Sequence, residues 1–255
     1  MNTTINVANC DIYLGQDAGK KVLNDIKNAK KALKIVSPYL SPSFVDELVI
    51  RHIKNVNVQL LTTDKIKENN SHHNFLSKLI IQHRIVNEEA EKTRNKWIDW
   101  CSFLLFGIVG YVIAFLLTVY FYSSIKLFYG IIPLVIAIMI RKLYQKKIMQ
   151  KRIYDYKYES LFPFKVLISP TYKNYYKGIF VHSKIYIIDD QIAYLGSLNF
   201  TESGMKYNYE TIIKITDKES VDKIIKEFNH LFSSSTFPSH HINHFGKELF
   251  TEEIN

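Results

Sequence analysis

The chain has 255 residues, which is enough for one sizeable domain or two small ones with a substantial hydrophobic core. Its two cysteines, Cys10 and Cys101, match no redox or metal-binding spacing, which argues against a disulfide framework and for a reducing compartment. The first residues lack the basic start and the apolar run of a signal peptide. The formal net charge is +9 at pH 7. Where the basic residues lie along the chain determines whether this charge indicates membrane topology or a nucleic-acid partner.

The first part of the chain alternates short apolar runs with amphipathic ones. The pattern predicts strands over 11–14, 34–36 and 56–63, with helices over 19–33 and 45–54 between them. Ser41 or Ser43 is placed to cap the second helix. A further helix is predicted over 75–92. Strands that alternate with helices in this way indicate a parallel sheet.

Residues 100–125 contain no charged side chain, and this run exceeds the roughly 20 apolar residues that cross a bilayer. A second run, 127–140, reaches spanning length if it begins near Ser123 and the Lys126 side chain snorkels to the surface. The sequence therefore predicts a transmembrane helical hairpin; two buried helices of a soluble core are the alternative. The hairpin is favoured by aromatic residues at the ends of the runs, namely Trp97, Trp100, Tyr120, Tyr122 and Tyr129.

Basic residues flank the hairpin on both sides. Residues 92–152 hold 10 Lys or Arg and one acid, Asp99; removing these from 33 basic and 24 acidic residues leaves 23 of each elsewhere. Positive flanks stay in the cytoplasm, so both termini should be cytoplasmic and only the turn near 123–126 should cross. The rest of the chain is formally neutral. The net charge of +9 is therefore first a signal of topology, and it is only weak evidence for a nucleic-acid groove.

After the hairpin we predict a basic helix to about Glu159, strands over 165–168, 179–189, 192–198 and 210–216, and a closing helix over 218–232. His240, His241 and His244 lie in a segment that we interpret as a solvated tail rather than a metal site, because no Cys or acid at ligand spacing accompanies them. The predicted fold is one α/β sandwich interrupted by the hairpin. Its parts are 1–95 and 148–235 (the two halves of the sandwich), 96–147 (the hairpin) and 236–255 (the tail).

Polar side chains occupy unusual places in the stretch HSKIYIIDDQIAYLGSLN, residues 182–199. In an extended chain His182 and Lys184 share a face, because successive side chains point to opposite sides. A turn at 189–191 and a second apolar run then bring Ser197 and Asn199 back. Read as a hairpin, the stretch gathers His, Lys, Ser and Asn at one edge of a sheet.

This spacing, with Asp189 and Gly196 included, resembles the HKD motif of the phospholipase D superfamily. Asn208 and Glu210 stand where single-motif members of that superfamily carry a further acid. The run LKIVSPYL near the N-terminus resembles the start of such domains, and only the hairpin and the tail fall outside the likeness. The resemblance implies a phospholipase D-like α/β sandwich. A chance pattern is the alternative, since H-x-K alone is common.

The resemblance implies catalytic roles for His182, Lys184, Asp189 and Glu210. His182 would attack phosphorus and form a phosphohistidine, and Glu210 would accept a hydrogen bond from its other ring nitrogen. Asp189 would have a supporting role. Lys184, Ser197 and Asn199 would bind the phosphate oxygens, so neither a metal nor another cofactor is expected.

The leaving group also needs a proton, and none of the other eight histidines lies in a second H-x-K. We therefore expect a homodimer in which each chain lends His182 to a shared site; a heteromer with a related protein is the alternative.

The expected substrate is membrane phospholipid, because the soluble part is neutral and the hairpin holds the site beside a bilayer. A membrane-tethered, metal-independent endonuclease is the alternative, and an idle scaffold is disfavoured because every motif residue is present. The motif leaves open hydrolysis versus transfer, and the head-group preference.

Overall fold

The computed structural model describes residues 4–5, 10–64, 73–122, 125–170 and 180–255. It divides into two compact units. The first contains residues 1–82 and 158–250, and the second contains residues 83–157 and 251–255. The domain boundaries given above at residues 95, 147 and 235 stay a prediction.

The first unit is built on a seven-stranded mixed sheet in the order β1-β9-β8-β7-β2-β3-β6. Strands β2, β3 and β6 run parallel to one another. The pairs β2–β7, β7–β8, β8–β9 and β9–β1 are antiparallel. Of the three strands predicted to form a parallel sheet, β2 and β3 pair parallel as expected, whereas β1 lies at the edge and pairs antiparallel with β9. The bounds are β1 Cys10–Gly15, β2 Ala32–Val36, β3 Asn57–Thr63, β6 Phe164–Leu167, β7 Ile185–Ile188, β8 Ile192–Gly196 and β9 Glu210–Ile215.

At the centre of this sheet, a strand that precedes the two long apolar helices in the sequence pairs with a strand that follows them. Strand β2 pairs antiparallel with β7, from Leu33 opposite Ile188 to Val36 opposite Ile185. Every residue of both strands is buried. Continuous apolar strands of this kind occupy the middle of a sheet that is covered on both faces.

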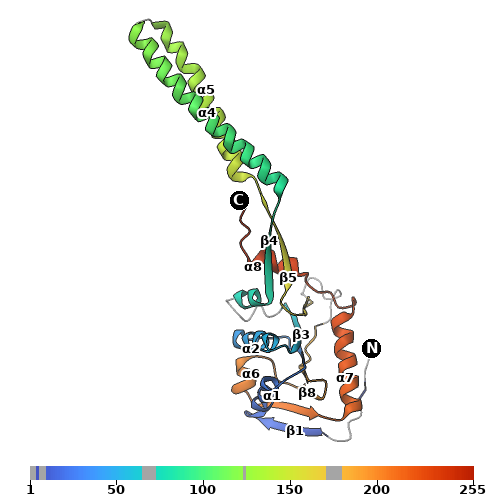
Figure 1. The fold of residues 1–255 in the computed structure, drawn as a ribbon. Helices are drawn as coiled ribbons and strands as arrows, with labels where there is room; N and C mark the ends of the chain where they lie inside the picture. The colour runs from blue at the N-terminus through green and yellow to red at the C-terminus, as the bar shows by residue number, and fades with distance from the viewer. Residues whose placement is uncertain (1–3, 6–9, 65–72, 123–124, 171–179) are drawn as a thin grey trace. The chain divides into compact units, whose positions relative to one another are not determined.

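Helices cover both faces, as Figure 1 shows: α7 lies on one side of the sheet, and α1, α2 and α6 lie on the other. Helix α7 packs Val221, Ile224 and Phe228 against the sheet, the stripe that a 3.6-residue period predicts. These helices are α1 Ala18–Lys27, α2 Pro42–Ile53, α6 Glu202–Lys206 and α7 Lys218–Ser233. The predicted closing helix is therefore confirmed.

The helix predicted over 19–33 is too long. Helix α1 ends at Lys27, and Leu33 lies in β2. The carboxylate of Asp189, in the turn between β7 and β8, accepts hydrogen bonds from the backbone N–H groups of Lys30 (3.0 Å), Lys31 (2.7 Å) and Ala32 (3.0 Å). Those N–H groups are thus held by a distant residue, which local periodicity cannot reveal.

Two segments predicted as helix are strands. Residues Ile80–Val86 form β4 and Tyr154–Ser160 form β5, and the two make a separate two-stranded sheet; a 3-10 helix, η1, covers His73–Leu79. Both strands are rich in β-branched or aromatic residues, and the alternating tyrosines of β5 have the two-residue period of a strand. The pairing of β4 with β5 therefore determines their structure, although the local residue pattern of each segment predicted a helix.

The segment after residue 236 is not a solvated tail. The N–H of His240 donates to the Val166 carbonyl (3.0 Å), and Leu167 forms an antiparallel bridge with Ser239. Helix α8, Ile242–Leu249, then buries Phe245 completely.

The strand predicted over 179–189 is shorter than expected, since the described residues 180–184 precede β7 without regular structure.

The second unit contains two helices, α4 Glu88–Phe121 and α5 Ile131–Gln150, with the 3-10 helix η2, Ile125–Gly130, before α5. The spans 88–121 and 128–150 are long and apolar enough to cross a membrane. Side chains on these spans are mostly exposed, as a lipid-facing pair requires. Of the predicted turn at 123–126, residues 123–124 lie outside the described residues.

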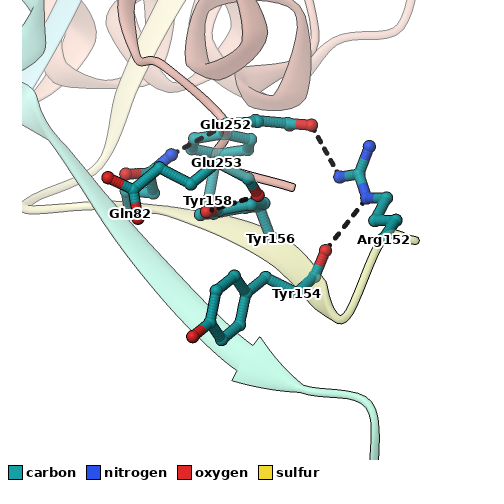
Figure 2. Close-up of polar contacts among 7 residues, drawn as sticks. All are labelled: Gln82, Arg152, Tyr154, Tyr156, Tyr158, Glu252 and Glu253. Carbon is teal, nitrogen blue, oxygen red and sulfur yellow. Dashed lines mark hydrogen bonds and ion pairs between the residues drawn. The ribbon is translucent and has the colours of Figure 1, made fainter. Parts of the chain in front are cut away.

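Residues 251–255 belong to this second unit. Figure 2 shows the Arg152 guanidinium between the Tyr154 carbonyl (2.9 Å) and the Glu252 carboxylate (2.6 Å), while the Tyr156 hydroxyl donates to the Glu253 carbonyl (3.0 Å). The Asn255 side-chain amide donates to carbonyls in the last turn of α5, including that of Met149 at 2.7 Å. These contacts satisfy carbonyl groups that a helix end leaves free.

The Asp189 contacts predict a stability effect that depends on pH. Burial opposes ionisation of this carboxyl, but the N–H groups of Lys31, Ala32 and Lys30 outweigh it and hold the pKa below 3.8. Asp189→Ala should lower the free energy of unfolding in detergent by about 1–2 kcal/mol, because the N–H groups of Lys30, Lys31 and the part-buried Ala32 lose a charged acceptor. The contribution is complete above pH 3.8 and is lost as the pH falls through the lowered pKa.

Urea unfolding of wild type and Asp189→Ala at several pH values measures this difference. Gln191→Ala, an exposed change in the same turn, is the control and should have little effect. A difference below about 0.5 kcal/mol at neutral pH, or one that grows as the solution is acidified, would contradict the account.

Candidate active site

Loops from both halves of the chain meet at one end of the seven-stranded sheet. The pairings of Val36 with Ile185 and of Ile185 with Leu195 place the end of β2, the start of β7 and the end of β8 at the same edge. The start of β9 joins them, since Gly196 pairs with Ile212. His182 and Lys184 therefore lie just before β7, Ser197 just after β8, and Glu210 at the first position of β9.

His182 and Lys184 are in direct contact. The Lys184 ammonium lies 3.0 Å from His182 Nδ1 and 2.9 Å from Nε2, and it donates to the His182 carbonyl at 2.8 Å. His182 is exposed, whereas Lys184 is only 5% exposed. Partial desolvation of the ring and the charge of Lys184 lower the pKa of His182 below 6.5. The site thus presents a neutral imidazole to solvent with a cation beside it.

Behind Lys184 lies a buried carboxylate. Glu210 accepts a hydrogen bond from the Ser197 hydroxyl and one from the Asn208 side-chain amide at 3.1 Å. Burial lowers the pKa of Lys184, and the charge of Glu210 partly opposes that shift. The structure does not contain the predicted hydrogen bond from His182 to Glu210, because both ring nitrogens face the Lys184 ammonium instead.

Gly196 allows β8 and β9 to approach closely at this point. A Cβ at residue 196 would lie 2.0 Å from the Thr211 carbonyl oxygen, which leaves no room for any side chain. The Ser197 N–H donates to the same carbonyl (3.0 Å), and the Thr211 N–H donates to the Ser197 hydroxyl (3.1 Å). The glycine of the motif therefore fixes the position of the serine that holds Glu210.

The residues that follow Asn199 are anchored by the loop after β2, to whose Ser37 the sequence analysis assigned no role. Ser37, after β2, is fully buried, and its hydroxyl accepts from the Phe200 N–H at 2.9 Å and donates to the Tyr39 carbonyl at 2.7 Å. The Ser41 hydroxyl accepts from the Glu202 N–H at 2.9 Å. Asn199 Oδ1 is buried in this setting without a hydrogen-bond partner in the described part of the chain. Serines directly after an apolar strand are the only signal in the sequence.

Asp189 lies away from this group. It follows β7, whereas His182 and Lys184 precede that strand, so four extended residues, roughly 13 Å, separate them. Its φ of 53° and that of Asp190, 57°, suit the tight turn between β7 and β8. The structure therefore brings together His182, Lys184, Ser197 and Glu210, and places Asp189 in the turn at the other end of the strand.

Among the described residues, no group of three or more His, Cys, Asp or Glu side chains is arranged to hold a metal ion. In the segment after residue 236, the rings of His240 and His244 stack with centroids 4.8 Å apart, and His240 Nε2 lies 3.6 Å from the Asp64 carboxylate. Stacked imidazoles direct their faces, not their nitrogens, toward each other. This cluster therefore lacks the geometry of a ligand set.

The family model described as cardiolipin synthase, phospholipase D-like domain, matches residues 132–232 of this chain. Among individual proteins, cardiolipin synthase 1 from Bacillus anthracis is 38% identical over 61 residues. That alignment covers 24% of this chain and 12% of the relative, so most of the relative has no counterpart here.

Among solved structures, Nuc from Salmonella typhimurium, a phospholipase D family member, aligns at 12% identity with a TM-score of 0.43. The alignment covers 91% of this chain and 99% of Nuc. NucT from Helicobacter pylori aligns at 15% identity with a TM-score of 0.42, over 87% of this chain and 93% of NucT.

The contact between His182 and Lys184 predicts how the histidine titrates. Lys184→Gln removes the neighbouring cation, so the pKa of His182 should rise toward 6.5. Histidine-selective NMR titration in detergent measures this pKa, and the resonance of His52, on α2, serves as an internal control. An unchanged or lower pKa for His182 would show that the ammonium does not set its protonation.

Proposed function

We propose that this chain, which belongs to the phospholipase D superfamily through its match over residues 132–232, is a membrane-anchored phosphodiesterase that acts on phospholipid. The observation that carries the proposal is the exposed, neutral His182 in contact with the buried Lys184 ammonium. A neutral imidazole is a nucleophile, and a fixed cation beside it attracts the anionic phosphodiester.

In the proposed reaction, one ring nitrogen of His182 attacks phosphorus and the bond from phosphorus to the head-group oxygen breaks. This step leaves a phosphatidyl group on His182 and releases the head-group alcohol, which takes up a proton. Water then attacks the same phosphorus, the P–N bond breaks, and phosphatidic acid leaves. If a second alcohol replaces water, the same site transfers the phosphatidyl group instead of hydrolysing it.

The surrounding residues stabilise charge in this scheme. Lys184 and the Asn199 side-chain amide bind the non-bridging phosphate oxygens. Glu210 keeps the buried ammonium charged, since its negative charge raises the Lys184 pKa against the effect of burial. Because the Ser197 hydroxyl donates to Glu210, we assign Ser197 a positioning role through that carboxylate rather than a direct one on phosphate.

The leaving alcohol needs a proton donor, and we infer that a second copy of the chain supplies it through its own His182. Mixing wild type with His182→Ala chains tests this inference. If the site is shared, activity per wild-type chain should fall as the inactive chains are added in excess. Constant activity per wild-type chain would instead indicate that each chain is catalytically complete.

A phospholipid substrate is supported by two features. The relative from Bacillus anthracis is named as a cardiolipin synthase, and the chain carries two helices long and apolar enough to cross a membrane. A nucleic-acid substrate would call for additional free cations to bind the phosphates on either side of the cleaved bond. The chain outside residues 92–152 is formally neutral.

Incubation of the detergent-purified protein with mixed phospholipid vesicles, and separately with DNA and RNA, tests the proposal. We expect wild type to release a free head group from lipid, with or without chelator, and His182→Ala to lose at least about a thousandfold in rate. Phosphatidic acid as co-product indicates hydrolysis, and an exchanged lipid indicates transfer. Nucleic-acid cleavage by wild type alone, with vesicles intact, would overturn the lipid assignment.

A further inference from the structure

The backbone on both sides of Asn199 is held more firmly than the Asn199 side chain. Asn199 Oδ1 is buried without a hydrogen-bond partner in the described part of the chain, so no hydrogen bond at this oxygen orients the amide. The neighbouring side chains, those of Leu198 and Phe200, are both fully buried. The direction of the Asn199 amide is therefore determined by a short backbone segment between two anchored residues.

Two buried hydroxyl groups hold this segment, one on each side of Asn199. The Tyr186 hydroxyl, on β7, donates to the Leu198 carbonyl at 2.7 Å. The Phe200 N–H donates to the Ser37 hydroxyl at 2.9 Å. Because both bonds are shielded from water, the loss of either hydroxyl leaves a backbone group without a partner. The segment would then have to move to restore a hydrogen bond.

The Ser37 hydroxyl is itself fixed in orientation. Its single proton is donated to the Tyr39 carbonyl at 2.7 Å, which leaves its oxygen lone pairs for the Phe200 N–H. The Ser37 backbone N–H donates to the Leu61 carbonyl on β3 at 3.0 Å. This anchor of the Asn199 segment is therefore part of the central sheet and does not depend on another loop.

Ser37 is fully buried, so any effect it has on the reaction acts through the residues it holds. In the proposed reaction the Asn199 amide donates to a phosphate oxygen on which negative charge develops. Such a donor works only at the right place, and a displacement of about 1 Å can cost on the order of a hundredfold in rate. Rigid backbone anchors beside Asn199 prevent a displacement of this kind.

We propose that Ser37 is a positioning residue, which holds the Phe200 N–H so that the Asn199 amide can donate to a phosphate oxygen at His182. Tyr186 has the same role on the other side of Asn199. This inference rests on the proposed function and deepens it, since it assigns a part in phosphate binding to a residue from the other half of the chain.

A double-mutant cycle with the full chain in proteoliposomes tests this role. Ser37→Ala should lower kcat on phospholipid about tenfold, because the amide is displaced. In an Asn199→Ala background the same change should lower kcat less than about twofold, since no amide remains to be positioned. The KM for vesicles should stay nearly unchanged in Ser37→Ala. An equal loss of kcat with and without Asn199 would overturn the proposal, because it would reflect only a less stable fold.

Thr63→Val is the matched control. The buried Thr63 hydroxyl donates to the Pro38 carbonyl at 3.1 Å, in the loop that carries Ser37. Any loss of kcat in this variant should be the same in both backgrounds. Tyr186→Phe removes the other anchor and should show the same dependence on Asn199 as Ser37→Ala. This variant also carries the test if Ser37→Ala does not fold, and a loss independent of Asn199 would again overturn the proposal.

Binding of inorganic phosphate gives a readout without turnover. In protein with isotope-labelled asparagine, NMR identifies the Asn199 side-chain amide as the resonance missing in Asn199→Ala. Phosphate should shift it in wild type and in Thr63→Val, whereas Ser37→Ala or Tyr186→Phe should need about tenfold more phosphate. No shift in wild type, or an unchanged midpoint in Ser37→Ala, would overturn the proposal even if lipid turnover is established. If wild type cleaves neither lipid nor nucleic acid while these shifts are seen, the proposed function fails and the positioning role stands.

Discussion

The pairing of β2 with β7 is the constraint on which the rest of the structure depends. These two strands are separated by about 150 residues, including both long apolar helices, yet they lie side by side at the buried centre of one sheet. Closing such a long loop costs only slightly more conformational entropy than closing a short one. The burial of both strands outweighs that cost, so the inserted helices do not prevent assembly. The same pairing brings the Ser37 loop next to His182 and Lys184.

The protonation states of Lys184 and His182 depend on two effects, desolvation by burial and the charges of neighbouring groups. Lys184 is buried, which disfavours its charge, and Glu210 behind it restores part of what is lost. Partial desolvation of the ring, together with the charge of this ammonium, lowers the pKa of His182 and so favours its neutral form. Gly196 and Ser197 hold Glu210 in place through backbone contacts with Thr211. Each member therefore depends on the next, and in the proposed reaction the group offers a nucleophile and a cation to an anionic ester. Removing any one of them should disturb the protonation of the others.

Sequence reasoning recovered the parts that local pattern determines. The spacing of His182, Lys184, Ser197 and Asn199 predicted a shared sheet edge, and the structure places His182, Lys184 and Ser197 at one end of the sheet. Glu210, which the resemblance had added, lies at the same end. Sequence reasoning failed where contacts between residues far apart in the chain determine the local structure. Asp189 shortens the first helix by binding N–H groups more than 150 residues away, and β4 becomes a strand because β5 pairs with it. Phe245 turns the supposed tail into a packed helix. The role of Ser37 was also invisible, since its partner Phe200 lies in the other half of the chain.

The central claim is that His182 is the nucleophile, and trapping the covalent intermediate tests it most directly. The protein is mixed with phospholipid vesicles, quenched within milliseconds to seconds, digested, and analysed by mass spectrometry under conditions that preserve phosphoramidate bonds. The account predicts a phosphatidyl adduct on the peptide that contains His182, at a level that falls once substrate is exhausted. Turnover without any adduct on His182, or with an adduct on a different residue, would contradict it.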